Sequence, residues 1–69
     1  MAALQKRSIS LSGHATSIAL EPEFWAVLQA RAAAEAISLA GLVGRIDDGR
    51  GARPLASACR VAALEWSKG

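Results

Sequence analysis

The ten residues 16–25 (TSIALEPEFW) constrain the fold most, because an extended segment there runs directly into the start of a helix. Thr16, Ile18 and Leu20 alternate with small residues, which predicts a strand with one apolar face. Pro22 suits the first helical turn, where its missing N–H group would have no partner in any case. A single strand needs a second one, and the simplest source is another copy of the chain.

Three helices are predicted after this strand. The first covers 22–36, an alanine-rich run with larger apolar residues at helical spacing. Ser38 is a good N-cap for a second helix over 39–47. A loop rich in glycine and arginine precedes a third helix over 55–67. The fold class is therefore mainly α with one short strand.

Two glycines in the second predicted helix need an explanation. Gly41 and Gly44 each weaken a helix by about 1 kcal/mol relative to alanine. Glycines at such positions often mark the close approach of another backbone. We therefore expect a neighbouring chain segment to pass close to this helix.

The size of the chain favours self-association. It has 69 residues, and much of its 52% hydrophobic content is alanine. Domains below about 70–80 residues usually need a staple or a partner. Cys59 is the only cysteine, so neither an intrachain disulfide nor a cysteine metal cage can form, and a reducing cytoplasm is expected. The net charge of +2 permits nucleic-acid binding without requiring it.

The domain is expected to span 8–67, after a mobile arm at 1–7 and before a tail at 68–69. The N-terminal residues lack the apolar core of a secretory signal. No apolar run approaches the roughly 20 residues that cross a bilayer, so no membrane association is expected.

A second local interpretation stays open at 8–12 (SISLS), which alternates as the strand does. Ser12 and Gly13 could then form the turn of an intrachain hairpin. In that arrangement Ile9 would lie opposite Ile18, and Leu11 opposite Thr16.

The block 13–25 (GHATSIALEPEFW), with 37–39 (ISL), 46–47 (ID) and 55–61 (LASACRV), resembles a small bacterial family of stand-alone ribbon-helix-helix proteins. This family belongs to the Arc and methionine-repressor superfamily, and the resemblance covers about 8–66. It implies a homodimer in which one strand from each chain pairs antiparallel, forming an intermolecular ribbon packed on the helices. The expected dimer core comprises Thr16, Ile18, Leu20, Phe24, Leu28, Leu42, Val43 and Ile46.

The resemblance also implies that the outer face of the ribbon enters the DNA major groove, which admits a two-stranded ribbon. The candidate DNA-binding residues on this face and on the preceding arm are Lys6, Arg7, His14, Ala15, Ser17 and Ala19. The start of the second helix (Ser38, Leu39 and Ala40) would offer N–H groups to a DNA phosphate. The implied function is transcriptional regulation or an accessory DNA-binding role.

Two alanines and one serine on the outer face offer few donors or acceptors for reading bases. An alternative function is therefore a dimeric protein-interaction module with weak or no specific DNA binding. An enzyme is not expected, since the single histidine has no nearby acid for a catalytic set. No cofactor and no metal site are expected, and Asp47 and Asp48 are interpreted as a solvated pair.

Three other features have structural interpretations. Trp25 and Trp66 lie in apolar helical stripes and are expected to pack in the core or the dimer interface rather than to stack on bases. The loop with Arg50 and Arg53 lacks the Lys-Ser/Thr ending of a phosphate-binding loop. We interpret it as a connector whose arginines could touch nucleic acid or a partner.

Overall fold

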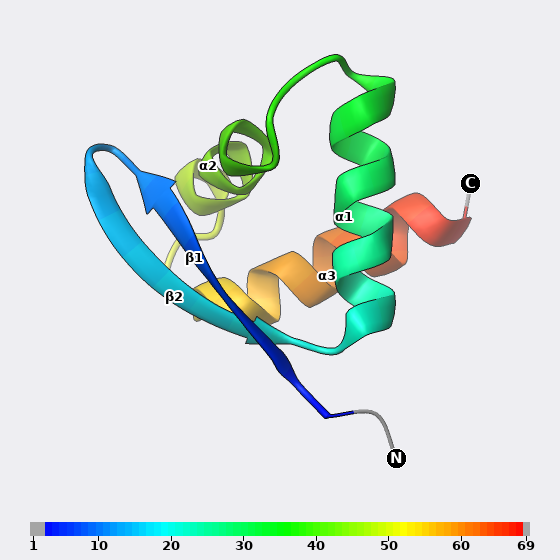
Figure 1. Cartoon of the computed structure of the whole chain (residues 1–69), viewed down its shortest axis with the longest axis horizontal. Coiled ribbons are helices and arrows are strands. Elements are labelled where there is room, and N and C mark those ends of the chain that lie inside the picture. Colours follow the sequence, from blue (N-terminus) through cyan, green and yellow to red (C-terminus); the bar gives the residue numbers. More distant parts are fainter. Residues whose placement is uncertain (1–2, 69) are drawn as a thin grey trace.

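A computed structural model describes residues 3–68 of the chain as a β-hairpin packed on three helices (Figure 1). The elements follow in the order β1 (Gln5–Leu11), β2 (His14–Leu20), α1 (Pro22–Ala34), α2 (Leu39–Gly49) and α3 (Leu55–Lys68). The expected mainly helical class is confirmed, but there are two strands rather than one.

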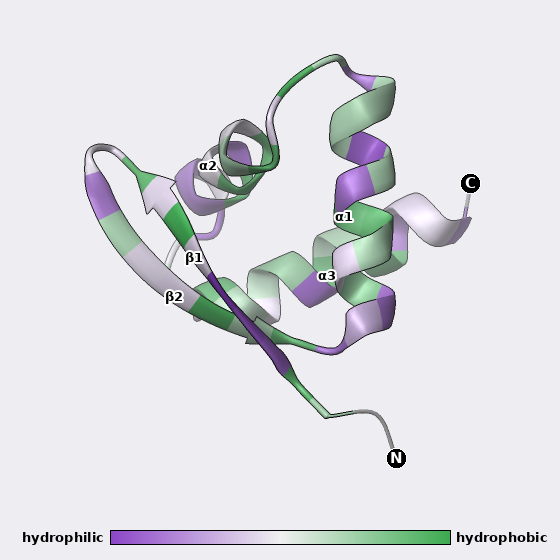
Figure 2. Cartoon of the chain, viewed as in Figure 1, coloured by the Kyte–Doolittle hydropathy of each residue, from purple (hydrophilic) through white to green (hydrophobic). Residues whose placement is uncertain are grey.

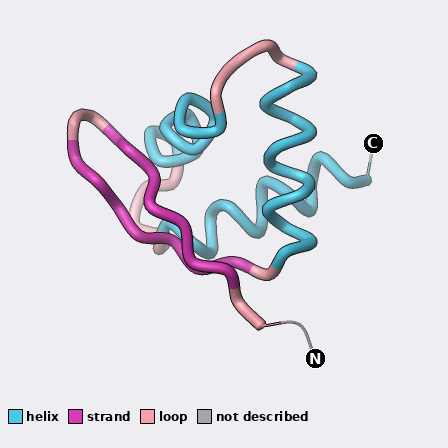
Figure 3. Tube along the Cα trace, in the orientation of Figure 1, coloured by secondary structure: helices cyan, strands magenta, loops and turns pink. Residues whose placement is uncertain are grey.

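The partner of the predicted strand lies in the same chain. β1 and β2 pair antiparallel, so the expectation of a lone strand at 16–20 is wrong (Figure 3). The alternative of an intrachain hairpin is confirmed in kind, but its expected register is wrong by two residues: Ile9 lies opposite Thr16. The reason is the turn, which uses only Ser12 (φ 51°) and Gly13 (φ 81°). Positive φ at both residues is what a tight type I′ hairpin turn requires.

The boundaries predicted at the two ends of the domain shift accordingly. Residues 5–7, expected in the N-terminal arm, lie in β1, and Lys68, expected in the tail, is the last residue of α3. The arm residues 1–2 and the tail residue 69 lie outside the described part of the chain. Residues 3 and 4 precede β1 and are exposed.

The hairpin has one face toward the helices and one toward solvent. Ile9, Ile18 and Leu20 are buried, whereas Ser8, Ser10 and Ser17 are exposed. This alternation confirms the predicted inner face of the strand, and Figure 2 shows apolar and polar residues alternating along it. The twisted ribbon lies across α2 and α3.

The core forms within one chain. Five of the eight residues expected at a dimer core are buried there without a partner: Ile18, Leu20, Leu28, Leu42 and Val43. The other three, Thr16, Phe24 and Ile46, are partly buried. A single chain can form this core because β1 contributes Ile9 and α3 contributes Cys59 and Ala63.

The predicted helix starts are confirmed, but each end differs. Helix α1 ends at Ala34, two residues earlier than expected, because Ala36 adopts a left-handed conformation (φ 56°). The N–H groups of Ala36 and Ile37 bond back to Ala33 and Ala32, which closes a Schellman motif without the usual glycine. Helix α2 extends two residues beyond 47 and α3 one beyond 67.

Trp25 joins the hairpin to α1. Its indole N–H donates a 2.8 Å hydrogen bond to the carbonyl of Gln5, and the Arg7 guanidinium lies 5.0 Å from the ring centroid. A second long-range tie links α3 to the end of β2, where Arg60 pairs with Glu21 at 2.9 Å. Trp66 lies on α3 beneath Arg31 of α1 and is half-buried. Both tryptophans therefore pack as expected.

Gly41 and Gly44 of α2 do not closely approach another backbone segment among the described residues. A Cβ atom at Gly41 would lie 3.2 Å from the Ser38 hydroxyl, and one at Gly44 would meet nothing within 4 Å. No single helix among residues 3–68 is long and apolar enough to cross a membrane, although α1 and α2 together, bent by 103°, reach that length and composition.

Candidate nucleic-acid interface

The solvent face of the hairpin, here named the outer ribbon face, carries three residues from each strand. They are Lys6, Ser8 and Ser10 of β1 and Ala15, Ser17 and Ala19 of β2. Lys6 lies opposite Ala19, Ser8 opposite Ser17, and Ser10 opposite Ala15. Ala19 is half-buried and the other five residues are exposed. The structure thus brings together four of the predicted DNA-binding residues and adds Ser8 and Ser10.

Sequence reasoning missed Ser8 and Ser10 as interface candidates because β1 was treated only as an alternative strand. The signal was present in the alternation of serine with Ile9 and Leu11. Ser8 lies directly opposite Ser17 across the ribbon, so these two hydroxyl-bearing residues form a pair at the centre of the face.

The chemistry of the outer ribbon face suits a polyanion in shape and charge. Five of its six side chains are those of serine or alanine and are short, the sixth is Lys6, and none of the six residues is acidic. A two-stranded ribbon of this kind fits the width of the DNA major groove. Serine hydroxyls can donate or accept toward either base of a pair, and alanine can contact only a thymine methyl. The face therefore allows close approach to DNA but offers few contacts that distinguish one base sequence from another.

Arg7 and His14 lie elsewhere. Arg7 alternates onto the inner side of β1, where it is half-buried against the ring of Trp25. His14 is exposed next to the turn, opposite Leu11. Lys6 is thus the only cation on the outer ribbon face, and it takes part in none of the ion pairs among the described residues.

The start of α2 lies beside the turn end of the ribbon. Ser38 caps the helix by accepting a 2.9 Å hydrogen bond from the N–H of Gly41, as predicted, and no acidic residue lies in the first turn. A hollow of about 360 Å³ is lined by Ser10 of β1, by Ser12 of the turn and by Ala40 of this helix start, and its other wall carries Asp47 and Asp48 of α2. The outer ribbon face and the helix start at which a DNA phosphate is expected therefore border one surface region, which also contains two carboxylates.

Replacing Ser38 with alanine should lower the free energy of unfolding by about 1 kcal/mol, because it removes the acceptor for the Gly41 N–H. Chemical denaturation followed by circular dichroism measures this change. Ser38→Asp, which keeps an acceptor, should retain the stability of the parent chain. Equal losses for both variants would show that the cap does not stabilise α2.

Most of the arginines in the helices and their connecting loops form ion pairs with carboxylates. Glu35 binds both Arg31 and Arg45, and the Arg31 hydrogen bond holds the pKa of that carboxyl below its usual value. A hydrogen bond from Arg60 likewise lowers the pKa of Glu21. The Arg45 pair links α2 to the end of α1, and the Arg60 pair links α3 to the start of α1, whereas Lys6 forms no ion pair among the described residues.

Cys59 is buried, and its environment disfavours the thiolate. Burial raises the pKa of the Cys59 thiol to about 11, so the thiolate nucleophile is scarce near neutral pH. No group of three histidine, cysteine, aspartate or glutamate side chains within residues 3–68 gathers to hold a metal ion.

A two-stranded ribbon with a small polar outer face, followed by helices, is the arrangement that defines the class of this protein. Residues 4–67 match the ribbon-helix-helix domain family, and the chain belongs to it. Members of this family typically form dimers and bind DNA, and they are generally not catalytic.

Among solved structures, the chain is similar to an uncharacterized protein from Bordetella pertussis Tohama I. The two are 37% identical with a TM-score of 0.83, and the match covers 96% of this chain. The chain spans 57% of the length of that protein. No curated protein matches the chain.

Proposed function

We propose that this protein is a homodimeric DNA-binding protein of the bacterial cytoplasm that acts as a transcriptional regulator or an accessory DNA-binding protein. Membership of the ribbon-helix-helix family supports this function. The observation that carries it is the outer ribbon face, which exposes Lys6 and three serines and bears no carboxylate. In this proposal the face enters the major groove.

The dimer would form at the edge of β2 that does not pair with β1. The sheet has only two strands within residues 3–68, so each strand has one edge without a strand partner. Antiparallel pairing of β2 with the β2 of a second copy would give a four-stranded sheet and satisfy those backbone groups. The two central β2 strands, with Ala15, Ser17 and Ala19 of both copies, would then form the two-stranded ribbon that enters the major groove, and the two β1 strands would flank it.

DNA phosphates would be bound at the edges of the outer ribbon face. The N–H groups of Leu39 and Ala40 at the start of α2 have no acceptor within the helix, and the helix dipole favours an anion there. Lys6 would contact a second phosphate by charge. Because such contacts are independent of sequence, we expect affinity to depend more on salt than on base identity.

The test is a titration of fluorescent duplex DNA with the intact chain at about 50 mM and about 200 mM salt. Affinity should fall steeply, with a log–log slope of about −2 or steeper if both Lys6 side chains of a dimer contact phosphates. Light scattering should show a dimer under the same conditions. A dimer that binds no duplex at the lower salt concentration contradicts the DNA-binding proposal, and a stable monomer contradicts the dimer.

A second candidate function is a dimeric module that binds a protein, supported by the lack of base-reading side chains at Ala15 and Ala19. Lys6→Ala distinguishes the two functions. It should weaken DNA binding and flatten its salt dependence, whereas affinity for a protein partner captured by pull-down should be unchanged.

A further inference from the structure

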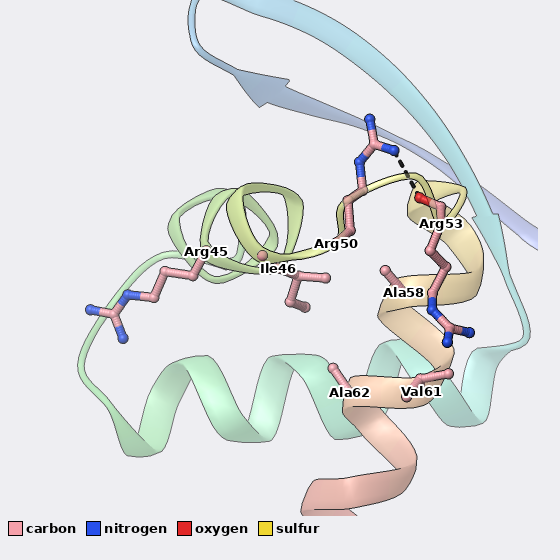
Figure 4. Close-up of a pocket in the computed structure, with 8 residues that line it drawn as sticks. Arg45, Ile46, Arg50, Arg53, Ala58, Val61 and Ala62 are labelled. Carbon is pink, nitrogen blue, oxygen red and sulfur yellow. Dashed lines mark hydrogen bonds between the residues drawn. The ribbon is translucent and has the colours of Figure 1, made fainter.

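A shallow hollow of about 290 Å³ lies between α2 and α3 and has no role in DNA binding as proposed above (Figure 4). We name it the α2–α3 pocket. It is lined by Arg45, Ile46, Gly49 and Arg50 from α2 and its end, Arg53 from the following loop, and Ala58, Val61 and Ala62 from α3.

The floor of the α2–α3 pocket is apolar. Ile46 of α2 faces Ala58 and Ala62 of α3 across the hollow, as Figure 4 shows. Val61, at its edge, is 40% exposed, which is high for a valine. The two small alanines leave the space open, and burying this surface under an apolar group would be favourable. The volume matches the lower range of small-molecule sites.

The three arginines at the rim of the α2–α3 pocket differ in whether a carboxylate pairs with them. The Arg45 guanidinium binds Glu35 at 2.7 Å, and Arg50 binds Asp47 at 2.6 Å. Arg53 has no carboxylate partner among residues 3–68, and its one side-chain bond is a long 3.4 Å contact to the Ser57 hydroxyl. No residue lining the hollow is acidic. Arg53 therefore offers a guanidinium with no carboxylate partner, and it lies next to Val61 at the edge of the hollow (Figure 4).

We propose that the α2–α3 pocket binds a small organic acid that combines one carboxylate with a compact apolar body. The carboxylate would pair with both arms of the Arg53 guanidinium, which is the geometry that this side chain favours. The apolar body would cover Ile46, Ala58 and Ala62. Inorganic phosphate would satisfy Arg53 alone and leave the floor exposed, so the two features together select the amphiphilic acid. This inference does not depend on the DNA-binding proposal.

The test uses hexanoate as the probe, added to the intact isotope-labelled chain and followed by amide chemical shifts. Hexanoate should shift amides around the α2–α3 pocket and saturate in the millimolar range. Hexanamide, which has the same apolar body without the charge, should bind at least about tenfold more weakly, as the loss of a charged hydrogen-bonded pair predicts. Inorganic phosphate should cause no comparable shifts at this site.

Two variants locate the site. Arg53→Gln should weaken hexanoate at least about tenfold and leave hexanamide unchanged, whereas Lys6→Gln removes the same charge from the ribbon and should change neither. Ala62→Leu should fill the floor and abolish binding of both probes, with circular dichroism confirming a folded chain. The proposal is overturned by equal binding of hexanoate and hexanamide, by phosphate binding at the pocket as tightly as hexanoate, or by a folded Ala62→Leu chain that binds normally. It is also overturned if the pocket amides shift with protein concentration alone, because a second copy then covers this face.

Discussion

Replacing Trp25 with alanine is expected to lower the free energy of unfolding by about 3–5 kcal/mol, a large share of what a domain of this size possesses. The side chain is 1% exposed and is the largest one in the core. Its indole N–H also holds the Gln5 carbonyl of β1. The substitution therefore removes packing beneath the hairpin and frees its first strand. Urea denaturation followed by circular dichroism measures the loss.

Two controls separate the packing from the hydrogen bond. Trp25→Phe keeps most of the ring but loses the bond to Gln5, so a loss of about 1–3 kcal/mol is expected. Trp66→Ala removes a half-buried tryptophan from the end of α3 and should cost less than Trp25→Ala. Equal effects at the two tryptophans would show that Trp25 does not have the special role in the hairpin that its contacts indicate.

Replacing Ser17 with glutamate is expected to reduce the affinity for duplex DNA at least about tenfold at low salt. Ser17 lies in the middle of β2 and faces Ser8 at the centre of the outer ribbon face. A carboxylate there would enter the negative potential of the groove, and each dimer would carry two. The stability of the chain should change little, because Ser17 is exposed. Fluorescence anisotropy with labelled duplex measures the affinity.

The matched control is Ser67→Glu, which adds the same charge at an exposed position near the end of α3. It should reduce affinity much less, because only overall charge changes. If Ser17→Glu binds DNA as well as Ser67→Glu does, the outer ribbon face is not the surface that meets DNA, and the helix starts or the arginine loop would have to be tested instead.

Local signals in the sequence sufficed for the helix starts and for the faces of β2. Pro22 acts through its fixed backbone conformation and its missing N–H, and Ser38 caps α2 as expected. The alternation of Ile18 and Leu20 with small residues likewise requires only that one side be buried. These features depend on a few adjacent residues, so the sequence carries them completely.

The remaining features depend on choices between competing structures. The alternation at 8–12 left open whether this segment pairs with 16–20 in a hairpin. The tight turn at Ser12 and Gly13 sets both the pairing and its register, which the side chains alone did not determine. The early end of α1 relies on an alanine in a conformation that alanine seldom adopts. Arg7 lies on the inner side of β1 against Trp25, which is 18 residues away in sequence. A contact between such distant residues depends on the tertiary fold, so the sequence did not indicate it.

The intrachain pairing of β1 with β2 separates folding from assembly. A chain that needed its twin to complete a sheet would unfold on dilution, since neither half could exist alone. Here each molecule forms its own hydrogen-bonded ladder and its own core, so the monomer should unfold in a unimolecular transition and stay folded on dilution. Association would then respond to cellular abundance as an independent equilibrium, and occupancy of a chromosomal site could rise and fall with copy number while every molecule stays intact.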